Sequence, residues 1–131
     1  MEAVIQGMSM MLDPFNLGLI LVGVLIGVLV GALPGLSSPM AISLLIPFSI
    51  TLEPIPAIAM MAALYCAGTF GGSITAILIN APGAPPAAAT ALDGYPMAQR
   101  GEAGRALGLA TFSSVIGGVI SLVIFLLSLI H

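Results

Sequence analysis

Charged side chains are almost absent from this sequence. Asp, Glu, Lys and Arg make up 5% of the 131 residues, whereas an average soluble domain has roughly 25%. Only two of the charged residues are basic, so the chain lacks the electropositive surface that nucleic acids and anionic lipid headgroups require. Hydrophobic residues make up 60% of the chain, and no charge interrupts its long apolar runs. We therefore predict an integral membrane protein that lies in a lipid bilayer and binds no nucleic acid.

Residue types that carry enzyme chemistry are equally scarce. The only histidine is the last residue, His131, the only cysteine is Cys66, and no pair of carboxylates lies inside an apolar run. General acid–base catalysis, nucleophilic catalysis and metal binding need such groups close together. The sequence therefore indicates no enzyme, no metal-ligand cluster and no organic cofactor. Cys66 cannot form an internal disulfide, and we expect it to be a small buried apolar residue.

The apolar runs predict an all-α membrane domain, because a helix needs about 20 apolar residues to cross the hydrocarbon layer. The second run is short and contains Pro47, so it fits a half-helix or a kinked span. Residues 1–15 form a mildly acidic lead or an interfacial segment, which leaves residues 16–131 as the transmembrane domain. The four predicted spans are residues 16–33, 40–52, 57–79 and 106–130.

Two Pro-Gly pairs interrupt the apolar pattern and are predicted helix breaks. Proline removes a backbone hydrogen bond and glycine frees the backbone, so helices should stop near Pro34 and Gly35 and again near Pro82 and Gly83. A short helix that begins with proline is expected after each pair, and the free N–H groups at a helix start attract anions. The alternative for the first break is a plain loop between two spanning helices.

Glycines are concentrated in two of the apolar runs. In the first run, Gly23, Gly27 and Gly31 recur every four residues. This spacing places a flat stripe of small residues on one helix face, which is typical of close helix packing in membranes.

In the third run, the glycine-rich segment 68–73 is predicted to split the span into two half-helices. Irregular backbone at membrane depth is tolerated only where protein or water satisfies its polar groups, so such a split would face a cavity or a ligand. Carbonyl oxygens freed at Gly71 and Gly72, together with Asn80, form a candidate site for Na⁺. The alternative is that these small residues only let two helices approach closely.

The most polar part of the chain is residues 97–105, which follow a turn signal at residues 93–96. Arg100 and Arg105 lie in this predicted loop. Because basic residues favour the cytoplasmic side, we interpret both as determinants of topology and not as carboxylate ligands. Three crossings precede the loop, so the N-terminus is expected in the periplasm.

Three segments resemble one known family. They are GALPGL with the following ISLLIP (residues 31–36 and 42–47), GGSITAILINAPG (71–83) and ALDGYPMAQRGEAGRALG (91–108). Their order, spacing and residue identities resemble the N-terminal part of TctA, the large membrane subunit of tripartite tricarboxylate transporters. The resemblance extends over nearly the whole chain from about residue 14, and the third segment is the most specific.

The resemblance implies a multi-pass protein of the bacterial inner membrane that transports tricarboxylates or related carboxylates and is driven by a gradient of Na⁺ or H⁺. It also implies an extracytoplasmic solute-binding protein, a small membrane subunit and the remaining half of the transporter as partners, because family members are several times longer. Ala84, Pro86 and Ala87 depart from the family pattern, which has more polar residues after Pro82-Gly83.

A carboxylate carrier needs hydrogen-bond donors without a buried fixed cation, and helix starts with Ser and Thr hydroxyls supply them. We therefore expect the two Pro-Gly breaks to face each other across a substrate site. The candidate substrate-binding residues are Ser37, Ser38, Gly71, Gly72, Ser73, Thr75, Asn80 and Gly83. The alternative is a truncated or remnant structural or assembly protein, whose glycines only pack helices and which has no transport activity of its own.

Overall fold

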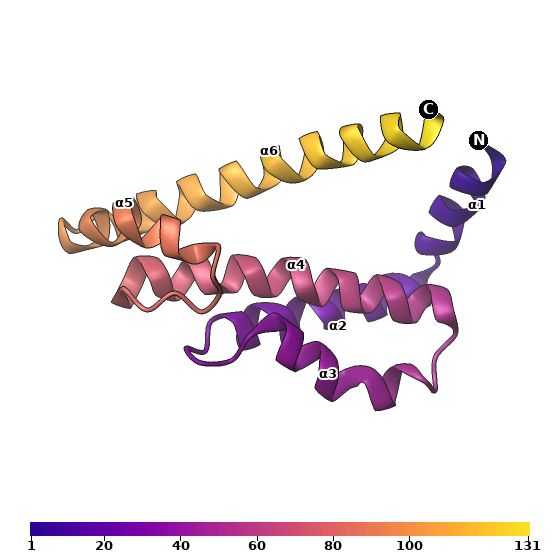
Figure 1. Ribbon diagram of the computed structural model, residues 1–131, viewed down its shortest axis with the longest axis horizontal. Helices are drawn as coiled ribbons and strands as arrows, with labels where there is room; N and C mark the ends of the chain where they lie inside the picture. Colours follow the sequence, from indigo (N-terminus) through magenta and orange to yellow (C-terminus); the bar gives the residue numbers. More distant parts are fainter.

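The computed structural model describes residues 1–131, and its secondary structure is entirely helical (Figure 1). Three helices are long and apolar enough to cross a membrane, and a fourth is apolar but shorter. The predicted all-α membrane architecture with about four apolar segments is therefore confirmed. The helices are α1 (Glu2–Met11), α2 (Pro14–Gly31), α3 (Ser38–Ser49), α4 (Pro54–Ile79), α5 (Ala87–Gln99) and α6 (Ala103–Ile130).

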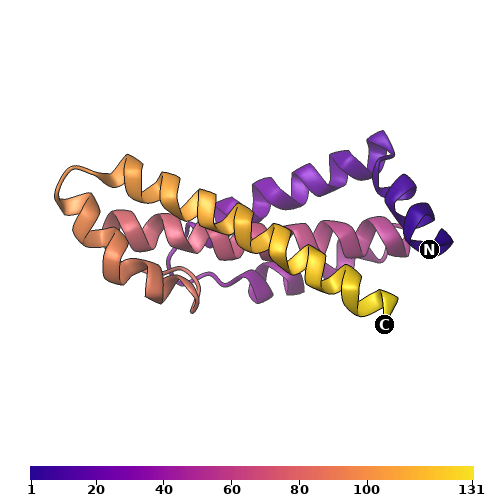
Figure 2. The ribbon, with the colours of Figure 1, turned by 90° about the horizontal axis from the view of Figure 1, so that it is seen from above.

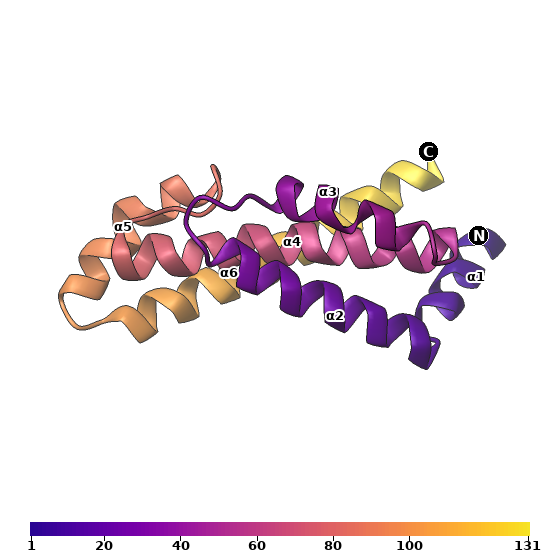
Figure 3. The same cartoon turned by 90° about the horizontal axis from the view of Figure 1, so that it is seen from below.

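Helix α4 lies at the centre of the molecule, and in the view of Figure 1 α2 and α3 lie below it and α5 and α6 above it. Figure 3 shows α2 and α3 along opposite edges of α4. Helices α2 and α4 run in the same direction, so α3 carries the chain back between them. Helix α6 then runs opposite to α4, and Figure 2 shows its long course towards the end at which α1 lies. The two chain termini are therefore at one end of the molecule, and the connection between α5 and α6 is at the other.

The contact between α2 and α4 depends on the glycine stripe predicted from the sequence. A methyl group added to Gly23 would lie 2.5 Å from the carbonyl oxygen of Met60. One added to Gly27 would lie 2.8 Å from the side chain of Ala67. These distances are shorter than a carbon contact allows, so only glycine permits this backbone approach. The same interface fully buries Leu64, which is 0% exposed.

The split expected at residues 68–73 is wrong, because α4 continues as one helix from Pro54 to Ile79. No proline lies in its interior beyond the first turn, so no hydrogen-bond donor is lost there. Lipid offers the freed backbone groups no other partner, which favours retention of the helical bonds even at glycine. Gly71 instead packs on α2, since a methyl group there would lie 2.6 Å from the carbonyl oxygen of Val28.

The turn predicted at residues 93–96 is also wrong. Helix α5 runs through these residues to Gln99, with Pro96 inside it, and the connection to α6 is limited to residues 100–102. Gly94 is buried against Ile77 of α4, where a methyl group would lie 2.6 Å from the Ile77 side chain. Packing on α4 has thus overridden the local turn signal.

The other helices begin and end close to the bounds predicted from the sequence. Helix α3 has Pro39 in its first turn and includes Pro47, and it is 12 residues long. Cys66, expected to be buried, is exposed on the surface of α4. It lies on a face of α4 that no other helix covers in this structure.

We expect Gly27→Ala to lower the free energy of unfolding by about 1 to 3 kcal/mol, the usual cost of overpacking a tight contact. The measurement is thermal or denaturant unfolding in detergent, followed by circular dichroism. Gly18→Ala is the matched control on the same helix, because nothing lies within 4 Å of a methyl group at Gly18. Equal stability of the two variants would contradict a glycine-dependent contact between α2 and α4.

Candidate functional site

Two tips of non-helical chain pack against neighbouring residues of α4, the first against Gly71 and the second against Gly72. The first tip, residues 32–37, joins α2 to α3 and contains Pro34 and Gly35, which has a φ of +92°. The second tip, residues 80–86, joins α4 to α5 and contains Pro82 and Gly83. A side chain at Gly83 would collide with the carbonyl oxygen of Gly31, at the end of α2. The second tip is therefore in direct contact with the end of α2, where the first tip begins.

The second tip turns back along α4. The N–H group of Gly83 donates to the carbonyl of Gly72 at 3.4 Å, although Gly72 lies seven residues before the end of α4. At 1.5 Å per residue, the chain has returned by about 10 Å towards the middle of the helix. A methyl group at Gly72 would lie only 2.8 Å from the backbone nitrogen of Ala84, so glycine is needed for this approach as well.

We use the name glycine junction for the place where the tips, α2 and α4 touch. Its members are Gly31, Gly68, Gly71, Gly72 and Gly83. The side chain of Ser38, at the start of α3, occupies the space that a side chain on Gly68 would need. Ser38 is only 4% exposed. The junction thus brings the Ser38 side chain to closely packed backbone.

The helix starts at the two tips have fewer free donors than the sequence suggested. At α3, the N–H groups of Met40 and Ala41 both donate to the carbonyl of Ser37, at 3.0 and 3.1 Å. At α5, the N–H of Ala87 donates to the carbonyl of Ala84 at 2.9 Å. The prolines that begin these helices, Pro39 among them, have no N–H group at all. The side chains at the tips are therefore more available to a ligand than the first helical N–H groups.

The predicted site residues do not all gather in one place. The glycines at positions 71, 72 and 83 lie with Ser38 at the glycine junction, whereas Ser37 precedes Ser38 in the first tip and is half-buried. The Thr75 hydroxyl donates back to the carbonyl of Gly72 within α4 at 3.2 Å. Asn80 is exposed and ends α4 in a left-handed conformation with φ of 55°. Since α4 is unbroken and the Gly72 carbonyl already accepts two hydrogen bonds, the freed carbonyls that suggested Na⁺ at Gly71, Gly72 and Asn80 are absent.

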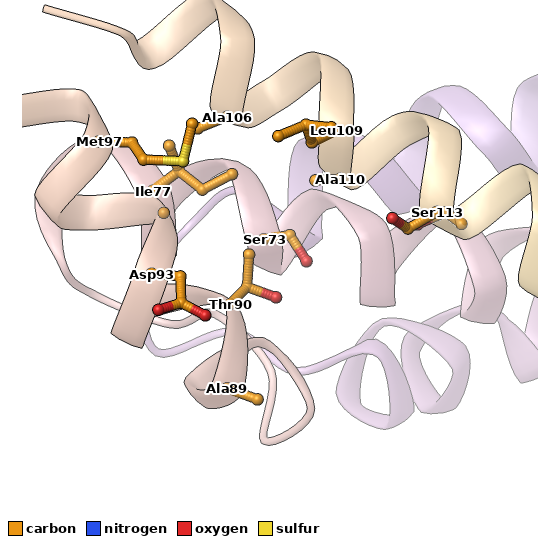
Figure 4. A pocket seen from close by; sticks show the side chains of 12 residues that line it. Ser73, Ile77, Ala89, Thr90, Asp93, Met97, Ala106, Leu109, Ala110 and Ser113 are labelled. Carbon is orange, nitrogen blue, oxygen red and sulfur yellow. The ribbon is translucent and has the colours of Figure 1, made fainter.

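Ser73 faces a different space, a cavity of about 470 Å³ between α4, α5 and α6 (Figure 4). Figure 4 shows Ser73, Thr90 and Asp93 on the side of α4 and α5, and Ser113 on α6. Four hydroxyl side chains and one carboxylate line this cavity, and none of the lining residues is basic. Its lining residues are Ser73, Ile77, Ala89, Thr90, Asp93, Gly94, Met97, Ala106, Leu109, Ala110, Ser113 and Ser114.

Sequence reasoning missed Thr90 and Asp93 because it ended α5 before residue 93. Thr90, Asp93 and Met97 recur at the spacing of one helix face, a signal that would have found the cavity if the helix had been predicted. The basic residues lie elsewhere: Arg105 pairs with Glu102 at 3.7 Å, and Arg100 is exposed in the connection to α6. No cluster of His, Cys, Asp or Glu that could hold a metal ion is present.

The family model for the "Tripartite tricarboxylate transporter TctA family" matches residues 17–130. The chain belongs to the TctA family. A protein of Agrobacterium vitis, described as "Uncharacterized 52.8 kDa protein in TAR-I ttuC' 3'region", is 40% identical over 115 residues, which is 88% of this chain and 23% of that relative. The chain therefore spans about a quarter of the length of this relative. No solved structure matches the chain.

In this TctA-family chain, we expect Gly72→Leu to push the second tip away from α4. Ala84, which is 8% exposed, should then become accessible. The measurement is the rate at which a maleimide labels Ala84→Cys in a Cys66→Ala background, with and without Gly72→Leu. Gly18→Leu is the control, because Gly18 has no neighbour within 4 Å. Slow labelling in all three proteins would mean that the tip does not depend on Gly72.

Proposed function

We propose that this chain forms the N-terminal part of the membrane subunit of a secondary transporter for tricarboxylates or related carboxylates. An ion gradient drives the transporter, and an extracytoplasmic solute-binding protein delivers the substrate to it in the bacterial inner membrane. A small membrane subunit and the rest of the large subunit complete the complex. The observation that carries the proposal is the packing of two non-helical tips against neighbouring residues of α4, Gly71 and Gly72, in a chain of the TctA family.

The position of the tips supports transport over a purely structural role. Hydrocarbon offers no partner to exposed backbone groups, so non-helical chain at membrane depth persists only next to protein or a watery cavity. Transporters place substrate sites at such points, where broken helices bring backbone groups to the middle of the bilayer. Helix packing alone explains the stripe at Gly23, Gly27 and Gly31, but it does not require a tip that returns to Gly72.

The chemistry of the glycine junction suits a carboxylate that must bind and then leave. Ser38 is 4% exposed and its side chain lies against Gly68, and a carboxylate oxygen accepts from hydroxyl donors. Neither arginine lies at the junction, so no fixed positive charge would hold the anion too tightly. Ser37, the residue before Ser38, supplies a second hydroxyl donor on this chain, and the remaining three quarters of the large subunit would close the site.

We expect the complete complex, reconstituted in proteoliposomes with its binding protein, to take up citrate only when an ion gradient is imposed. Ser38→Ala should weaken the apparent citrate affinity by about ten- to a hundredfold, because a hydrogen bond to a charged group contributes about 1.5 to 3 kcal/mol. Arg100→Gln is the control and should leave the affinity unchanged. A loss of affinity in Arg100→Gln with none in Ser38→Ala would move the anion site out of the membrane.

We expect the connection around Arg100 to lie in the cytoplasm and the N-terminus in the periplasm. Helices α2 and α4 both start at the end opposite to Arg100 and Arg105, and basic residues favour the cytoplasmic side. In a Cys66→Ala background, Glu53→Cys should react with an impermeant maleimide in intact cells. Gln99→Cys should react only after the membrane is permeabilised. The opposite labelling pattern would overturn this orientation.

A further inference from the structure

Helix α1 has a polar face and an apolar face. Glu2, Gln6 and Ser9 recur at the spacing of one helical face, and all three are exposed. Ile5 is 64% exposed and Met8 is 62% exposed, and α1 has no buried residue. The chain itself therefore leaves the apolar face of α1 uncovered. The members of this apolar face are Val4, Ile5, Met8 and Met11.

A helix of this kind needs an apolar surface beside it. Helix α1 is 10 residues long, and isolated helices shorter than about 12 to 15 residues are only marginally stable in water. Contact with an apolar surface removes one face of the helix from water and so stabilises the helix. We therefore expect Ile5 and Met8 to lie against such a surface in the assembled protein.

The position of α1 favours the lipid bilayer as that surface. Asp13 and Glu53 directly precede α2 and α4, both are exposed, and both line one recess at this end of the molecule. Charged side chains are costly in hydrocarbon, so the edge of the hydrocarbon layer is expected at the starts of these two helices. Only Leu12 and Asp13 separate α1 from α2, which places α1 at the same level.

The connection between α1 and α2 turns α1 out of the direction of the spanning helices. Pro14 begins α2, and the side chain of Asn16 donates a hydrogen bond to the carbonyl of Met10 at 2.7 Å. This carbonyl is in the last turn of α1, where carbonyls lack helical partners. Figures 1 and 2 show that α1 runs across the direction of α2. When α2 crosses the membrane, a helix in this direction lies along the membrane surface.

The apolar face of α1 is also continuous with the surface of α6. Met1 and Val4 line a cavity of about 310 Å³ together with side chains from the last turns of α6, and every lining residue is apolar. Helix α6 is long and apolar enough to cross a membrane, and its most apolar window has no buried residue. Lipid that covers the end of α6 would therefore cover the apolar face of α1 as well. The residues of α6 that line this cavity are Leu126, Leu129 and Ile130.

We propose that α1 is a membrane-surface helix, with Ile5 and Met8 among the lipid acyl chains and Gln6 in water. Its partner is the apolar part of the lipid and not the headgroup charge. Surface helices that bind anionic lipids carry Lys and Arg on the polar face, whereas no Lys or Arg precedes Arg100 in this chain. Helix α1 thus holds the start of α2 at the membrane surface by apolar burial. This inference does not depend on which substrate is transported.

The test uses single tryptophans, because the chain contains no Trp of its own. Ile5→Trp, Met8→Trp and Gln6→Trp are made in the full chain and reconstituted in phosphatidylcholine vesicles. Val119→Trp, on the exposed surface of α6, is the reference for a side chain in hydrocarbon. We expect brominated acyl chains to quench Ile5→Trp and Met8→Trp at a depth of about 5 to 10 Å below the headgroups. Aqueous iodide should quench Gln6→Trp more strongly than either.

Three results would contradict the proposal. Equal quenching of Met8→Trp and Gln6→Trp by iodide would mean that water surrounds α1. Shielding of Met8→Trp from both iodide and bromine would mean that protein, and not lipid, covers the apolar face. Deeper insertion of Met8→Trp after phosphatidylglycerol replaces half of the phosphatidylcholine would mean that headgroup charge holds the helix.

A second measurement in the complete complex covers the case in which the chain alone does not fold. A nitroxide spin label is attached to Met8→Cys or to Gln6→Cys in a Cys66→Ala background, with the other cysteines of the complex removed. The label on Met8→Cys should be more accessible to oxygen, which concentrates in hydrocarbon, than to a water-soluble nickel chelate. The label on Gln6→Cys should show the reverse. Low access of both reagents to Met8→Cys would identify a protein contact and overturn the assignment to lipid.

Discussion

The contact between α2 and α4 is the constraint on which the other features depend. Gly23, Gly27 and Gly31 let the two helices approach until the backbone of one meets the backbone of the other. Apolar side chains provide little attraction between helices in lipid, because lipid tails are equally apolar, so close backbone packing must provide it. The stripe ends at Gly31, and the first tip therefore begins beside the middle of α4 instead of beyond its end.

The same constraint positions the second tip. Gly83 and Ala84 fit against Gly31 and Gly72 only because the glycines have no side chains at the points of contact. Replacement of either glycine by a larger residue would separate the tip from α4 and with it the start of α5. Helix packing and the proposed substrate site are thus not alternatives here, since the glycines that hold the helices together also make room for the non-helical chain.

The sequence predicted the apolar helices and the chain breaks well, because Pro34 and Pro82 remove hydrogen-bond donors wherever they stand. It predicted α4 wrongly, since Gly68, Gly71 and Gly72 permit both a broken helix and a close contact, and the choice depends on a partner helix distant in the sequence. The end of α5 was also predicted wrongly, because Asp93 and Gly94 form a local turn signal that burial of Gly94 against Ile77 overrides. The cavity around Asp93 could not be predicted without that helix.

The geometry of α4 separates the glycine junction from the cavity. Successive residues of a helix point about 100° apart, so Gly72 faces the second tip while Ser73 faces the cavity. Helix α5 is the element common to both, because its first residues follow the tip and its middle turns line the cavity. Movement of α5 relative to α4 would therefore alter the glycine junction and the cavity at once.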